Sequence, residues 1–76
     1  MENKEKLFSR ANINARLIDA IKYCGMSQKE LASKAHITSS TLSDYIHKGK
    51  LPSLDTFYML CIAMDMSSDE ILGLKD

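Results

Sequence analysis

The sequence predicts an all-α domain, and three observations lead to that prediction. No segment alternates apolar and polar residues in the way of a half-buried strand, whereas several segments space their apolar residues at helical intervals. Hydroxyl residues stand at the expected N-cap positions before four of these segments. A chain of 76 residues, 45% of them apolar and 26% charged, is long enough for one small hydrophobic core and too short for two domains.

The first predicted helix has one apolar face, because its apolar residues recur at i, i+4, i+5 and i+8. They are Ile13, Leu17, Ile18 and Ile21. Gly25 follows at the position of a helix C-cap, so this helix is expected over about residues 13–24. We therefore expect the folded domain to span residues 13–76, with residues 1–12 as an N-terminal extension.

Four further helices are predicted from their caps. Complete capping boxes, in which a glutamate three residues on bonds back to the cap, are expected at Ser27 and Ser67. Thr38 and Ser53 are expected to cap their helices without that return bond. The predicted spans are 28–35, 39–47, 54–64 and 68–73.

The turn between the second and third predicted helices is the most informative segment. It leaves only three or four residues, so the two helices must cross steeply and share a small core. The core residues expected there are Leu31, Ala32, Ile37 and Leu42. This spacing is typical of a helix-turn-helix motif.

The charges are polarised along the chain although the net charge is zero. Residues 1–50 contain nine Lys and Arg against five Asp and Glu, whereas residues 51–76 contain one against five. The basic part of the domain is therefore suited to face a polyanion, and the acidic part to stay away from it.

Composition and motifs exclude several classes of protein. Two cysteines, Cys24 and Cys61, cannot form the dense disulfide framework of a small secreted protein, and the chain begins without an apolar leader core. The longest apolar run, 57–64, is eight residues against the roughly 20 of a membrane span, so we expect a cytoplasmic protein without a membrane span. His36, His47 and the cysteines lack metal-ligand spacing, and phosphate-loop and nucleophile motifs are absent. We expect no metal, no cofactor and no enzyme activity.

Four runs of residues resemble, in order and spacing, the lambda-repressor-like helix-turn-helix family, also known as Cro/cI or XRE-type. They are 27–32, 37–43, 52–56 and 66–72. The resemblance implies a compact five-helix bundle with the helix-turn-helix formed by the second and third helices. It also implies that the third helix lies in the major groove of double-stranded DNA, and that two copies bind a two-fold site.

The sequence departs from that family at four positions. His36 stands where the family usually has Gly, but His tolerates positive φ, so the turn is expected to survive. Ile46 replaces a frequent Glu and Ile21 a frequent Arg, so both partners of one ion pair are lost together. Gly49 follows the third helix one position late, which leaves the end of that helix open by a residue or two.

The face of the third predicted helix opposite Leu42, Tyr45 and Ile46 is expected to face DNA. It carries short hydroxyls, an acid and an imidazole, and no side chain that pairs bidentately with a base, so we expect water-mediated or shape-based recognition to contribute. Asp44 could accept a hydrogen bond from a cytosine amino group or could repel phosphate, and the sequence leaves both alternatives open.

The predicted DNA-binding residues come from the start of the second helix, the third helix with its cap, and the loop after it. The resemblance implies phosphate contacts from the first and last of these segments, and Lys34 is a further candidate. The set is Gln28, Lys29, Thr38, Ser39, Ser40, Thr41, Ser43, Asp44, Lys48 and Lys50.

The fourth predicted helix is apolar on all sides, so it must be covered on more than one side. The core is expected to take Phe57, Leu60, Cys61 and Met64, which leaves other apolar residues to cover. Intramolecular cover by the last helix and residues 7–8 is one alternative. The other is a two-fold homodimer at the acidic end. Its expected interface residues are Met59, Ile62, Met66, Leu72 and Leu74.

These features together predict a sequence-specific DNA-binding transcriptional regulator, a repressor of the phage or mobile-element kind. The alternative is a helix-turn-helix domain used as a protein-interaction module, an adaptor or antitoxin-like partner without strong DNA binding. The lack of Arg and Lys on the DNA-facing side of the third helix favours that alternative, and the basic first part of the chain opposes it. Both a complete short repressor and the N-terminal part of a longer one fit the sequence.

Overall fold

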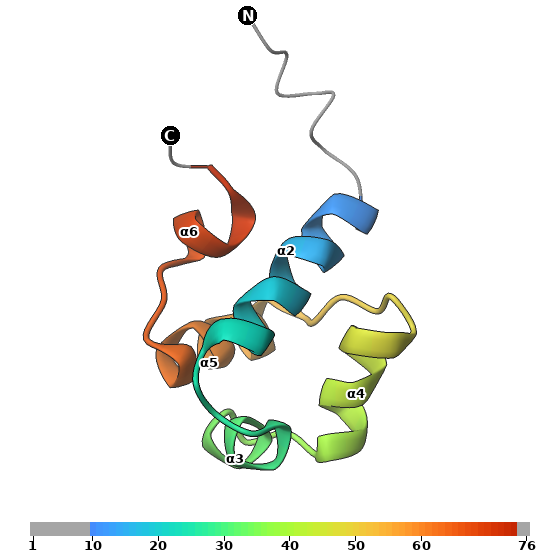
Figure 1. Ribbon diagram of the computed structural model, residues 1–76, viewed down its shortest axis with the longest axis vertical. Helices are drawn as coiled ribbons and strands as arrows, with labels where there is room; N and C mark the ends of the chain where they lie inside the picture. Colours follow the sequence, from blue (N-terminus) through green and yellow to red (C-terminus); the bar gives the residue numbers. More distant parts are fainter. Residues whose placement is uncertain (1–9, 75–76) are drawn as a thin grey trace, which may run out of the picture.

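The computed structural model describes residues 10–74, which fold into five helices with no strand in that range (Figure 1). The helices are α2 (Arg10–Tyr23), α3 (Gln28–Lys34), α4 (Ser39–His47), α5 (Leu54–Met64) and α6 (Ser68–Leu72). They correspond in order to the first to fifth predicted helices. The prediction of an all-α fold is therefore confirmed for the described residues, none of whose helices is long and apolar enough to cross a membrane.

The predicted helix boundaries agree with the structure to within one residue at every end except the first. The chain is already helical at Arg10, three residues before the expected start at Ile13. The expectation followed the apolar stripe, which begins at Ile13, whereas residues 10–12 contain no residue that breaks a helix.

The hydrophobic core takes one fully buried aliphatic side chain from every helix. These five side chains are Leu17, Leu31, Leu42, Leu60 and Ile71, each at most 2% exposed. Smaller residues such as Ala32 and Ala35 let α3 approach its neighbours, as the sequence predicted for Ala32. Ile21 is buried and Ile46 packs against the same core, so the two positions that lack the family's ion pair are filled by apolar contacts.

The turn after α3 depends on a left-handed residue at His36, whose φ is 60°. The His36 N–H donates to the Ser33 carbonyl at 3.2 Å, and the Ile37 N–H donates to the Ala32 carbonyl at 3.0 Å. These two bonds form a Schellman motif, which satisfies the last carbonyls of α3 and reverses the chain. The expectation that histidine preserves this turn is confirmed.

The two predicted capping boxes have different outcomes. At α6 the box is complete, because the Ser67 hydroxyl accepts from the Glu70 N–H and the Glu70 carboxylate accepts from the Ser67 N–H. At α3 only the first half forms, with Ser27 accepting from the Glu30 N–H at 3.1 Å. The Glu30 carboxylate lies 3.9 Å from the Lys34 ammonium instead. The prediction of a complete box at Ser27 is therefore wrong, because an i,i+4 ion pair takes the carboxylate.

Ser53 occupies the N-cap position of α5, as predicted, but its hydroxyl does not bond to the helix backbone. It bonds to the Asp55 carboxylate and the Thr56 hydroxyl, and Asp55 accepts from the Thr56 N–H at 3.0 Å. The hydrogen bond from the Ser53 hydroxyl, and to a smaller extent the one from the Thr56 N–H, holds the pKa of the Asp55 carboxyl below its usual value.

The apolar helix α5 is covered only in part. Leu60 and Met64 are buried, Phe57 and Cys61 are half-buried, and all four pack in the core as expected. Met59 also packs against the core. On the other side Tyr58 and Ile62 remain 64% and 58% exposed, so α6 does not cover them. The alternative cover by residues 7–8 lies outside the described residues.

Candidate nucleic-acid interface

The structure confirms the two faces predicted for α4. Leu42 and Tyr45 are buried and Ile46 packs beside them, whereas Ser40 and His47 on the other side are exposed. Burial raises the pKa of the Tyr45 phenol, because the core disfavours its charged form. The helix is thus fixed by its apolar face and presents its polar face to solvent.

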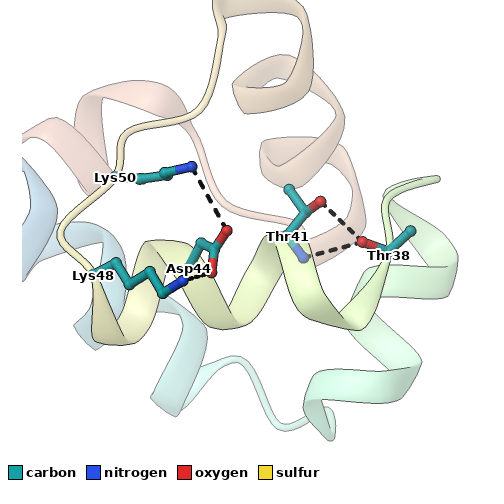
Figure 2. Close-up of polar contacts among 5 residues, drawn as sticks. All are labelled: Thr38, Thr41, Asp44, Lys48 and Lys50. Atoms are coloured by element: carbon teal, nitrogen blue, oxygen red, sulfur yellow. Dashed lines mark hydrogen bonds and ion pairs between the residues drawn. The ribbon is translucent and has the colours of Figure 1, made fainter.

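The hydroxyl residues at the N-terminus of α4 form two groups, those that take part in the helix cap and those that do not (Figure 2). Thr38 accepts from the Thr41 N–H at 3.0 Å, and the two threonine hydroxyls bond to each other at 2.9 Å. Thr38 and Thr41 are therefore engaged in the cap. Ser39 and Ser40 are exposed and make no side-chain hydrogen bond to the described part of the chain. The hydroxyls of Ser39 and Ser40 are available to a ligand at this end of the helix.

The start of α3 contributes a second exposed helix N-terminus. Gln28 and Lys29 form its first turn, directly after the Ser27 cap, and both are exposed. A helix N-terminus offers free N–H groups and a positive dipole, which favour a phosphate. Gln28 and Lys29 therefore have the environment that their predicted role requires.

The loop after α4 carries the two predicted phosphate-binding lysines. Helix α4 ends at His47, and Gly49 has a φ of 69°, which turns the chain between Lys48 and Lys50. Both lysine side chains are mostly exposed. The sequence left the end of this helix undecided by a residue or two, and the structure places it at His47.

Asp44 lies between these lysines on the last turns of α4 (Figure 2). One carboxylate oxygen, Oδ1, lies 3.6 Å from the Lys48 ammonium, and the other, Oδ2, lies 3.8 Å from the Lys50 ammonium. The Asp44 side chain is only 26% exposed. Asp44 is thus engaged within the chain, whereas the sequence offered only a cytosine or a phosphate as its counterpart.

One residue that positions this loop was not predicted. Asn14, half-buried on α2, donates from its amide nitrogen to the Tyr45 carbonyl at 2.8 Å and to the Lys50 carbonyl at 3.3 Å. It therefore ties the C-terminal end of α4 and the lysine loop to the first helix. The only signal in the sequence is a polar residue next to the apolar stripe that includes Ile13 and Leu17.

The helix-turn-helix with its loop is basic, and the part of the chain that follows it is acidic. Residues 27–50, which form α3, α4 and the loop, contain four lysines and two acids. Residues 51–74 contain four acids and no Lys or Arg. In Figure 1, α6 lies at the end of the molecule away from α3. The lysines of α3 therefore lie away from α6, whereas Arg16 of α2 lies beside it.

The predicted dimer residues lie in different surroundings. Ile62 and Met66 line a hollow between α5 and α6, together with Tyr58. Leu72 lines a separate apolar groove, Met59 packs against the core, and Leu74 is 56% exposed. The structure thus brings together two of the five residues.

This architecture matches a known protein family. The family model HTH_3, Helix-turn-helix, matches residues 19–71, more than half of the chain. The chain therefore belongs to the XRE-type, lambda-repressor-like helix-turn-helix family, and its fold is the one that the resemblance implied. This is a family of DNA-binding regulators and not typically of enzymes. Comparisons with curated proteins and with solved structures give no match.

Proposed function

We propose that the chain is a sequence-specific transcriptional repressor, of the phage or mobile-element kind, that places α4 in the major groove. The observation that carries this proposal is the N-terminus of α4, where Ser39 and Ser40 are exposed while Thr38 and Thr41 form the cap. In the helix-turn-helix arrangement, the N-terminal residues of the second helix of the motif contact base edges.

Groups suited to bind phosphate on both sides of α4 support the same orientation. Gln28 and Lys29 present the N-terminus of α3, and Lys48 and Lys50 present two ammonium groups at the other end. Such contacts fix the position of a protein on DNA and supply most of its non-specific affinity. The half-buried Ser43 completes the polar face between them.

Base recognition by this surface depends on short side chains. Serine and threonine hydroxyls bond to several bases, and no Arg, Lys, Asn or Gln lies on the exposed face of α4. Ordered water and the shape of the DNA are therefore expected to supply part of the specificity.

The phosphate contacts are tested by replacing Lys48 and Lys50 together with Ala. We expect the wild type to bind a labelled random-sequence duplex in fluorescence anisotropy, with log affinity falling linearly with log salt concentration. The double variant is expected to have a slope shallower by about one to two units, since each lysine displaces about one counterion. An unchanged slope would mean that the two lysines do not contact DNA phosphates.

A homodimer on a two-fold DNA site is part of the proposal. The hollow lined by Tyr58, Ile62 and Met66 supports it, because two of these side chains are large, apolar and more than half exposed. The hollow lies on α5 and α6, outside the helix-turn-helix. Analytical ultracentrifugation at high micromolar concentration is expected to show a dimer, and a monomer at that concentration would contradict this part of the proposal.

A protein-interaction module is the second candidate function. The observation that favours it is an apolar groove between α2, α5 and α6, with Leu54 84% exposed at its side. The groove is lined by residues that include Ile13, Phe57 and Leu72. The salt titration separates the two candidates, because a module of this kind would not bind the random duplex even at low salt.

A further inference from the structure

The Asp44 carboxylate is shared between the two lysines that the proposed function assigns to phosphate. Each of its oxygens lies near a different ammonium group, at 3.6 Å from Lys48 and 3.8 Å from Lys50. The lysine side chains are 69% and 65% exposed, whereas that of Asp44 is 26% exposed. The carboxylate is therefore less accessible to solvent than the two lysine side chains that contact it (Figure 2).

The backbone of the lysine loop is held by other bonds. The Asp44 carbonyl accepts from the Lys48 N–H at 2.9 Å and from the Lys50 N–H at 3.4 Å. The Lys50 carbonyl accepts from Asn14 at 3.3 Å. The position of the loop thus does not depend on the carboxylate, and the lysine side chains are free to change partners without moving the helix.

We propose that Asp44 competes with DNA phosphates for Lys48 and Lys50, and so holds down the affinity of the domain for DNA of arbitrary sequence. This inference rests on the proposed function. Carboxylate and phosphate oxygens are both charged acceptors for an ammonium group, so a phosphate that approaches either lysine competes with a contact that already exists within the chain. This cost falls on the electrostatic attraction that dominates non-specific binding.

The test is an Asp44→Asn variant, which keeps the shape of the side chain and removes its charge. We expect it to bind a random-sequence duplex about tenfold more tightly than the wild type at about 50 mM salt, with a slope of log affinity against log salt steeper by about one. Circular dichroism confirms that the variant is folded, and Asp44→Ser serves as a second variant. Equal binding by wild type and variants would overturn the inference and leave the proposed function standing.

The matched control is Glu30→Gln. Glu30 also forms an i,i+4 pair with a lysine of the helix-turn-helix, Lys34, at 3.9 Å, and the substitution removes the same charge. We expect a much smaller gain in affinity from this variant, because Glu30 pairs with one lysine that the proposed function does not use, whereas Asp44 is shared by two that it assigns to phosphate. If Glu30→Gln and Asp44→Asn raise the affinity for the duplex equally, the change in net charge alone explains the effect and the proposed competition at Asp44 is wrong.

A double-mutant cycle distinguishes competition from direct repulsion of phosphate. When Lys48 and Lys50 are both Ala, there is nothing for Asp44 to hold, so Asp44→Asn is expected to change the affinity far less than in the wild type. If Asp44→Asn raises the DNA affinity of the double Ala variant as much as that of the wild type, or more, Asp44 repels phosphate directly and the proposed competition is wrong. If neither the wild type nor Asp44→Asn binds the duplex at low salt, the proposed function itself fails.

Discussion

Replacing Leu42 with Ala is expected to lower the free energy of unfolding by about 3 kcal/mol, the largest effect of any substitution considered for this domain. Leu42 has no exposed surface, and it is the α4 residue among the five fully buried side chains. The loss combines the transfer free energy of the removed methyl groups with the cost of the cavity. A domain of this size has a total stability of about 4–11 kcal/mol, so the variant should lose about a quarter to three quarters of it.

Urea denaturation followed by circular dichroism measures this loss. Leu54→Ala is the matched control, because it makes the same chemical change at a side chain that is 84% exposed. We expect the control to change stability by less than about 0.5 kcal/mol. Similar losses in the two variants would mean that Leu42 does not hold α4 in the core as the structure describes.

Removal of the Asn14 amide is expected to have the second largest effect, a loss of about 1–3 kcal/mol in the free energy of unfolding. One amide nitrogen serves two carbonyls, those of Tyr45 and Lys50, which lie 31 and 36 residues away in the sequence. Without it the part-buried Tyr45 carbonyl at the end of α4 loses its side-chain donor. The lysine loop also loses its attachment to α2, so we expect faster amide hydrogen exchange in residues 48–51.

Two substitutions of Asn14 separate the lost bonds from lost volume. Asn14→Asp keeps the size of the side chain but points a carboxylate at two carbonyl oxygens, so it should be at least as destabilising as Asn14→Ala at neutral pH. A protonated Asp can donate one hydrogen bond, so the Asp variant should recover part of the difference as the pH falls below its carboxyl pKa. An Asp variant as stable as the wild type at neutral pH would show that the two bonds contribute nothing.

The sequence was sufficient for features that are set locally. The helix spans apart from the start of α2, the buried face of α4 and the left-handed turn at His36 follow from spacing and from residue types a few positions apart, and each is confirmed. The capping box at Ser27 shows where local reasoning fails. Glu30 could satisfy either the Ser27 backbone or Lys34, both within one turn, and only the fold decides between them.

The features of the candidate site that the sequence could not predict are long-range or shared. The bonds from Asn14 join α2 to a loop more than 30 residues away, and no periodicity reports such a pair. Asp44 was assigned to the DNA-facing side of its helix, but the return of the chain after Gly49 brings a second lysine to the same carboxylate. A side chain's helical face can be predicted from spacing, whereas its partner depends on where the next loop passes.

The contribution of one fully buried side chain from each helix makes every helix dependent on the others. Helices α3 and α6 have seven and five residues, well below the roughly 12–15 that a helix needs to persist alone in water. Loss of any one of them would expose the buried surface of the rest. The described domain should therefore unfold in a single cooperative transition, with the slowest-exchanging amides of all five helices sharing one opening free energy. A protease would then cut α4 only in molecules that have opened completely.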